Sequence, residues 1–182
     1  MKMLSAAAAL ALLAGAASAQ DNPTVGGAPM MADQPIAANA SMAPNLSTLV
    51  AAVQAAGLVE TLAGPGNFTV FAPTNDAFAA LPAGTVDTLL LPENREALTR
   101  VLTGHVVADE LFSSEFMELL ANGGVARLTT VAGTELEARM NGSTLEITDE
   151  MGGTATVEIA DVDQSNGVVH VIDAVLLPAD AM

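Results

Sequence analysis

The segment Asn166–Pro178 constrains the fold more than any other part of the chain. It opens on Asn166-Gly167, the strongest short signal for a β-hairpin turn, because both residues tolerate positive φ. The residues that follow are almost all apolar and rich in valine and isoleucine, which predicts a strand buried on both faces. Two polar side chains, His170 and Asp173, interrupt this run. Each must be hydrogen-bonded within the fold or serve a function.

Helices are expected mainly before residue 122 and strands mainly after it. The expected helices lie near 35–39, after Asn45 or Ser47, through Leu58–Leu62, after Asn75, after Pro92 and after Ser113. The expected strands are Phe68–Ala72, Arg127–Val131, Thr134–Met140, Ser143–Thr148, Thr154–Ile159 and Gly167–Leu177. Helices that cluster first and strands that cluster last predict an α+β fold with a largely antiparallel sheet.

The N-terminus is typical of an exported protein. Residues 1–19 combine one lysine, a short run of alanine and leucine, and an Ala-x-Ala site, which predicts a secretory signal peptide. Residues 20–33 are small, polar and rich in proline and glycine, and we expect an extended arm or linker there. A single domain is then expected over 34–180. The protein is therefore predicted to be periplasmic or extracellular.

Composition narrows the possible partners. The chain has 21 acidic and 5 basic side chains, a formal net charge of −16 at pH 7. So acidic a surface repels nucleic acid and anionic lipid. The mature chain has no second long apolar segment, so we expect no membrane insertion. The chain contains no cysteine, so its stability must come from packing and not from disulfides.

Two long motifs resemble the signatures of fasciclin-like domains. The first is Phe68–Phe78, with Phe71, Pro73, Thr74, Asn75, Asp76 and Phe78 at its characteristic positions, and the second is Asn166–Pro178 with Asn166, Gly167, His170 and Asp173. The resemblance covers about Gln34 to Pro178 and is closest to single-domain secreted members. It implies a β-sandwich-like antiparallel core with a layer of short helices around it. It also implies a non-catalytic adhesion or interaction module of cell-surface or matrix contacts.

The same resemblance suggests where a partner would bind. Some family members contact integrin-type receptors through an Asp-Ile pair ahead of the second signature, and Asp161-Val162 stands at that place. A Tyr-His pair between the signatures is the other receptor element. Here the histidine is His105, followed by Val106 and Val107, and the tyrosine is absent. We therefore expect partner contacts at an exposed Asp161-Val162 turn and at a surface near His105.

The sequence predicts no catalytic residue, no cofactor and no metal site. His105 and His170 are the only histidines, and each lies in an apolar run typical of a hydrogen-bonded core histidine. An enzyme that uses either histidine as a base is the weakest hypothesis, because no Gly-x-Ser-x-Gly motif is present. The acidic stretch 161–167 does not fit a calcium loop, because Ile172 stands where a bidentate glutamate is required.

A carrier of small molecules or metals in the cell envelope is the alternative function. Met30-Met31 and Met42 could in principle form a soft site for copper(I). We favour a structural role, in which these methionines dock the N-terminal arm onto the domain as adaptable apolar fillers.

Overall fold

The computed structural model describes residues 22–121 and 124–178. The predicted signal peptide, residues 1–19, lies outside the described residues. The helices are α1 (Ile36–Met42), α2 (Ser47–Ala56), α3 (Val59–Ala63), α4 (Asn75–Ala79), α5 (Thr85–Leu89), α6 (Arg95–Thr103) and α7 (Ser113–Leu120), with 3-10 turns at Pro44–Leu46 and Pro92–Asn94. The strands are β1 (Thr24–Val25), β2 (Ala28–Pro29), β3 (Phe68–Pro73), β4 (Val106–Val107), β5 (Ala126–Thr129), β6 (Glu135–Asn141), β7 (Thr144–Thr148), β8 (Thr154–Gln164) and β9 (Gly167–Ile172).

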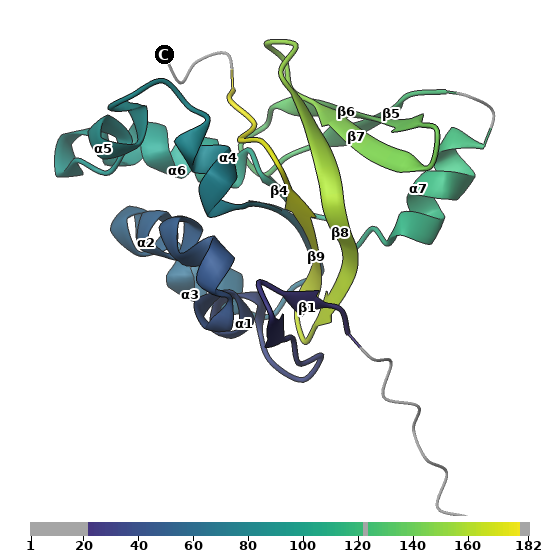
Figure 1. Ribbon diagram of the computed structural model, residues 1–182, viewed down its shortest axis with the longest axis horizontal. Coiled ribbons are helices and arrows are strands. Elements are labelled where there is room, and N and C mark those ends of the chain that lie inside the picture. Colours follow the sequence, from purple (N-terminus) through teal and green to yellow (C-terminus); the bar gives the residue numbers. More distant parts are fainter. Residues whose placement is uncertain (1–21, 122–123, 179–182) are drawn as a thin grey trace, which may run out of the picture.

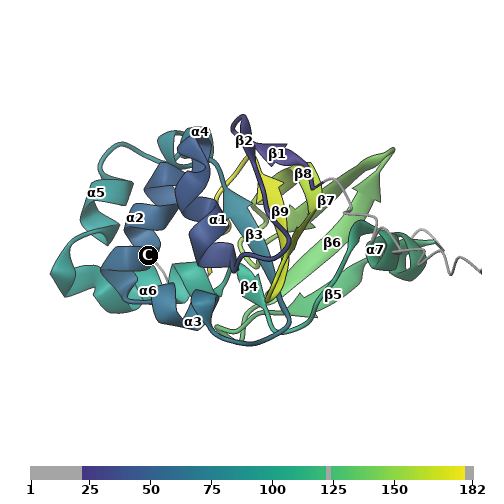
Figure 2. The same ribbon diagram turned by 90° about the horizontal axis from the view of Figure 1, so that it is seen from below.

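Seven strands form one mixed sheet in the order β4-β3-β9-β8-β7-β6-β5. Strands β3 and β9 run parallel, and every other neighbouring pair is antiparallel. A bridge between Val107 and Thr130 joins β4 to the end of β5, so the sheet curls almost into a barrel. Helices α1–α6 lie on one side of it and α7 on the other (Figures 1 and 2). The predicted α+β class is confirmed.

Two apolar clusters hold these layers together. The first lies between helices α1–α6 and strands β3, β8 and β9, where Leu49, Val53 and Val169 are buried. The second lies inside the curled sheet and beneath α7, where Phe71 and Phe116 are fully buried. The curled sheet therefore has helical packing on both of its sides.

Strand β9 is buried along its whole length, as expected. The turn before it differs from the prediction, because Ser165 and Asn166 connect Gln164 to its partner Gly167. Residue 167, with φ of +146°, must be glycine because it lies against β3. A Cβ atom there would lie 2.0 Å from the Phe68 carbonyl oxygen. A close approach of two strands, and not a hairpin turn, explains this glycine.

The residues expected to cap helices α2, α4 and α7 (Asn45 or Ser47, Asn75 and Ser113) do not cap them. Thr74 caps α4, where its hydroxyl oxygen accepts a hydrogen bond from Ala77 N at 3.3 Å. The Asn75 side chain turns to α2 instead, and its Oδ1 accepts from Thr48 N at 3.0 Å. Helix α2 therefore takes its cap from a side chain 27 residues further along the chain.

The N-terminal segment packs against the domain from Asn22 onward. Strands β1 and β2 form a short hairpin, which buries Val25 and Met30 in the first cluster. The Asn22 side chain pairs with the backbone of Asp163, donating to O at 2.7 Å and accepting from N at 3.0 Å. Met30 takes the filler role expected of it, whereas Met31 and Met42 are about half exposed. The domain boundary at residue 34 stays a prediction.

Among the described residues, no single helix is long and apolar enough to span a membrane, although the bent pair Ile36–Met42 and Pro44–Ala56 meets the length and composition requirements when counted together.

Candidate functional site

His105 is a buried structural residue. Its side chain lies between α6 and the C-terminal segment, where Leu176 N donates to Nε2 at 2.9 Å. The Nδ1–H group therefore donates to Val101 O at 2.8 Å. Burial lowers the pKa of His105 to about 4, and the Val101 hydrogen bond and the charge of Asp149 only partly oppose this. The ring is neutral near pH 7 and its nitrogens are both bonded to backbone.

His170 occupies an equally closed site on β9. Asp161 N donates to its Nδ1 at 3.3 Å, so Nε2–H donates to Leu111 O at 2.8 Å. The rings of Phe71 and Phe116 each lie with their centroids 5.8 Å from the imidazole centroid. Burial lowers the pKa of His170, despite the hydrogen bond to Leu111 and the nearby charge of Asp161. A neutral imidazole therefore ties β9 to the segment before α7.

Ser113, Asp161 and His170 lie close together without forming a catalytic triad. The Ser113 hydroxyl donates to the Asp161 carboxylate, and Asp161 meets His170 through its backbone N–H. Within the described residues no hydrogen bond joins Ser113 to His170. A triad needs the histidine to accept the serine proton and the carboxylate to orient the imidazole. The arrangement supports structure and has no nucleophile paired with a base.

The expected exposed turn at Asp161-Val162 is wrong. Both residues lie within β8, and Val162 pairs with Val169 and is 1% exposed. Asp161 sits at an irregularity of β8 with φ of +57°, which turns its carboxylate toward α7. Ser113 N donates to that carboxylate at 2.6 Å. Asp161 therefore caps α7, the role that the sequence suggested for Ser113.

The expected surface near His105 is also wrong. Val106 and Val107 form β4, and His105, Val106 and Val107 are exposed by only 2%, 7% and 2%. The surrounding strands and helices bury them, so their side chains add almost nothing to the outer surface of the protein. None of these three can form part of a contact surface for a protein partner on the outside of the folded domain.

The remaining motif residues are placed by packing and hydrogen bonds. Phe71, Pro73, Thr74 and Phe78 are buried, whereas Asp76 is exposed in the first turn of α4. The amide of Asn166 joins three segments, since Ile36 N donates to Oδ1 at 3.0 Å and Nδ2 donates to Leu62 O at 2.7 Å and Gly64 O at 2.9 Å.

Asp173 is exposed, and its Oδ1 accepts from Thr156 N at 2.6 Å. Both polar side chains of the β9 segment, His170 and Asp173, are therefore hydrogen-bonded within the fold.

Helix α7 is anchored by polar side chains from three strands. Besides Asp161 on β8 and His170 on β9, the Thr69 hydroxyl on β3 accepts from Leu111 N at 2.9 Å and donates to Asp109 O at 2.5 Å. The helix buries Phe116 and Leu120 against the sheet. Contacts from three adjacent strands thus fix both the start of α7 and its inner face.

Three large apolar side chains on or just after α7 are exposed, and Met117 and Leu119 project from the helix on either side of Glu118. Met117 is 56% exposed and Leu119 is 57% exposed, and Val125 just beyond the helix is 51% exposed. Glu115 and Glu118 are exposed on the same helix. We call Met117, Leu119 and Val125 the α7 patch. The buried positions Phe116 and Leu120 are four residues apart, and this helical spacing leaves Met117 and Leu119 outside the buried stripe.

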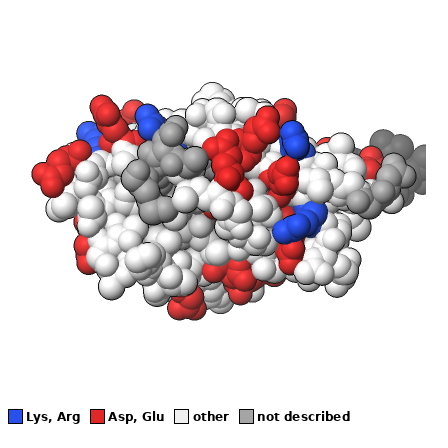
Figure 3. Space-filling view, turned by 90° about the horizontal axis from the view of Figure 1, so that it is seen from above, with Lys and Arg blue, Asp and Glu red and all other residues white. Residues whose placement is uncertain are grey.

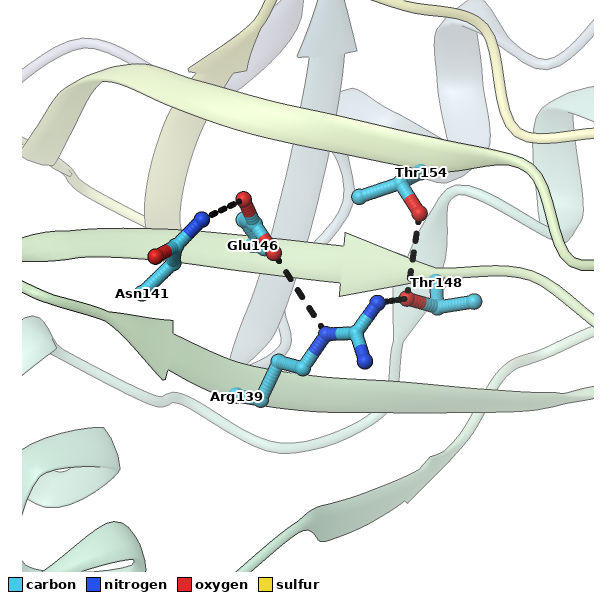
Figure 4. A network of polar contacts seen from close by, with 5 residues as sticks. All are labelled: Arg139, Asn141, Glu146, Thr148 and Thr154. Atoms are coloured by element: carbon cyan, nitrogen blue, oxygen red, sulfur yellow. Dashed lines mark hydrogen bonds and ion pairs between the residues drawn. The ribbon is translucent and has the colours of Figure 1, made fainter. Parts of the chain in front are cut away.

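The outer face of the β6–β7 pair is polar and internally paired. Glu146 receives Arg139 Nε at 3.4 Å and Asn141 Nδ2 at 2.7 Å, while Arg139 Nη2 reaches Thr148 Oγ1 at 3.4 Å (Figure 4). Thr148 in turn lies 3.5 Å from Thr154 Oγ1. The polar side chains drawn in Figure 4 are thus paired with one another on this face of the sheet.

Acidic side chains dominate the charged surface. The face seen in Figure 3 carries several separate acidic groups and only a few basic ones. Over residues 22–121 and 124–178, no three side chains of histidine, aspartate or glutamate gather as a metal site would require. Residues 161–164, weighed above as part of a calcium loop, lie in β8.

Comparison with known proteins identifies the family. The model of the Fasciclin domain matches residues 44–178. The chain belongs to the fasciclin domain family. Protein sll1483 of Synechocystis is 53% identical over 132 residues, 72% of this chain and 67% of that relative. The cell surface glycolipoprotein MPB83 of Mycobacterium bovis is 36% identical over 166 residues, 88% of this chain and 68% of the relative.

A solved structure shares the fold. The FAS1 domain pair from the insect cell adhesion molecule Fasciclin I superposes with a TM-score of 0.56 and 28% identity, over 69% of this chain and 42% of that one. The chain thus spans less than half of the two-domain structure. Fold and family follow from these matches.

Proposed function

We propose that the protein is an exported, non-catalytic interaction module that binds a protein of the cell surface or matrix through the α7 patch. Family membership supports the general role, because one relative is named a cell surface glycolipoprotein and a structural neighbour is a cell adhesion molecule. The observation that carries the location is the anchoring of α7 from three strands, described above. A contact helix that is held rigidly loses little conformational freedom on binding.

The α7 patch has the composition of an interface centre. Methionine is enriched in protein interfaces, where a few central residues supply most of the binding energy. Glu118 lies between Met117 and Leu119 on the exposed side of the helix, Glu115 is exposed one turn earlier, and the chain has a formal charge of −16. The partner surface we propose is therefore apolar opposite Met117 and Leu119 and basic opposite Glu115 and Glu118.

Asp161 has an indirect role in this proposal. Its carboxylate holds the first turn of α7 through Ser113, so it positions the patch without touching the partner. A variant of Asp161 would weaken binding through the orientation of α7. A variant of Met117 would weaken binding by direct loss of contact.

Binding of fluorescently labelled protein to isolated cell envelopes tests the proposal. Met117→Glu and Leu119→Glu should each reduce saturable binding about tenfold or more, because a carboxylate then meets an apolar centre. Met151→Glu is the matched control, since Met151 is 50% exposed but lies in the β7–β8 turn. Binding should also weaken as salt rises, because salt screens the attraction between the two glutamates and the basic groups of the partner. Equal binding by all three variants would refute the α7 patch as the contact surface.

A further inference from the structure

The helical layer and the sheet enclose an apolar cavity of about 80 Å³. The cavity exists where small side chains line it: Ala37 and Ala40 on α1 face it from the helical side, and Ala72 faces it from the sheet. Met30 of the N-terminal hairpin closes part of the wall. Voids larger than a water molecule are few in close-packed proteins, so a cavity of this size calls for an explanation.

The polar groups in the cavity wall are already hydrogen-bonded within the protein. Asn39 pairs with the backbone of Met31, accepting from N at 3.1 Å and donating to O at 2.7 Å, and it also donates to Gln164. The amide of Gln164 donates to Val162 O at 3.3 Å. Both nitrogens of His105 are bonded to backbone, as described above. No charged residue lines the cavity, so its wall offers no group that would favour a polar ligand.

The wall of the cavity includes residues that reach the surface. Thr61 and Val131 both line it, and both are exposed, Val131 by 47%. The deeper wall is formed by buried side chains such as Val25, Val53 and Val162. An apolar group can therefore enter the cavity past these exposed side chains while a polar group attached to it stays in water.

We propose that this cavity binds the end of an unbranched alkyl chain. The volume sets the length, because an engineered cavity of about 150 Å³ stays dry and binds benzene, so about 80 Å³ accommodates roughly three to four carbon atoms. The chain displaces no ordered polar contact and fills empty apolar space, which is costly to leave empty. This site lies on the opposite side of the sheet from α7 and is independent of the proposed interaction through the α7 patch.

A series of 1-alkanols, followed by NMR of the isoleucine, leucine and valine methyl groups, tests the proposal. From ethanol to 1-butanol the affinity should rise about fourfold per added methylene, and it should level off between 1-butanol and 1-hexanol once the cavity is full. The methyl groups of Val53 and Val162 should shift, whereas those of Leu119 should not. Shifts on adding phosphatidylcholine vesicles as well would identify lipid tails as the source; shifts with alkanols alone would identify free amphiphiles.

Two alanines on the same helix provide the matched variants. Ala37→Leu places a larger side chain in the cavity and should abolish the 1-butanol shifts, whereas Ala38→Leu, at a half-buried position outside the cavity wall, should preserve them. If no alkanol shifts the methyl groups of the cavity wall, or if affinity rises with chain length without levelling off and survives Ala37→Leu, the proposal is overturned.

Discussion

Asp161 affects stability in two ways, through the cap that its carboxylate provides and through its backbone conformation, and replacing it separates the two. The carboxylate caps α7, and loss of such a cap costs about 1 kcal/mol. The backbone of Asp161 has φ of +57°, a conformation that costs most residues about 1–2 kcal/mol and aspartate, asparagine and glycine less. Asp161→Ala should therefore lower the free energy of unfolding by about 2–3 kcal/mol.

Two further replacements resolve those contributions. Asp161→Gly relieves the backbone strain but removes the cap, so it should cost about 1 kcal/mol. Asp161→Asn retains an acceptor for Ser113 N and tolerates positive φ, so it should cost less than about 1 kcal/mol. Asp163→Ala is the control, because the hydrogen bonds of Asp163 in the described part of the chain involve only its backbone, and it should change stability by less than about 0.5 kcal/mol.

Equilibrium unfolding in urea, followed by circular dichroism, measures these differences. The expected order of destabilisation is alanine, then glycine, then asparagine, with hydrogen exchange in α7 accelerated in the alanine variant. If Asp161→Ala is as stable as Asp163→Ala, then the carboxylate neither caps the helix nor stabilises the positive φ of residue 161. The anchoring of α7 through Asp161 is then refuted.

Three other perturbations test the fold. Gly167→Ala should lower the free energy of unfolding in urea by more than about 3 kcal/mol, because the added Cβ would collide with a β3 carbonyl. Gly142→Ala has open space around it and should lower that free energy by about 1 kcal/mol. Equal losses for the two variants would contradict the close approach of β9 to β3. Asn75→Ala should lower the melting temperature by a few degrees through the lost cap of α2, an effect absent if the cap is unimportant. The pKa of His105 is about 4 in the folded protein and 6.5 in the unfolded chain, so the unfolded chain binds the proton first as pH falls. The free energy of unfolding should therefore decline by roughly 3 kcal/mol between pH 6.5 and pH 4. His105→Asn should flatten that decline in stability measured from pH 7 to pH 4, and an unchanged slope would show that His105 does not cause it.

The sequence predicts what depends on local pattern. Alternation of Leu136, Ala138 and Met140 with charged residues predicted β6 and its polar outer face, and the apolar run after Gly167 predicted a strand buried on both faces. Both patterns arise from the two-residue period of a strand, which any short window of sequence displays.

The sequence could not predict contacts between distant segments. The cap of α2 comes from Asn75, and the cap of α7 comes from Asp161, 48 residues away. Serines at the starts of these helices are good caps in isolation, so local preference pointed to the wrong residues. Strand β8 continues to Gln164 through two register shifts, and those shifts hide the alternation that would have placed Val162 inside.

Site-specific photo-cross-linking from α7 in the native cell envelope tests the central claim most directly. A photoreactive residue in place of Met117 should capture one predominant protein partner, and capture should decline when Asp161→Ala is added. The same residue in place of Met151 should not capture that partner. If positions 117 and 151 capture the same proteins in equal yield, or if position 117 captures none, α7 is not the interaction surface of this protein.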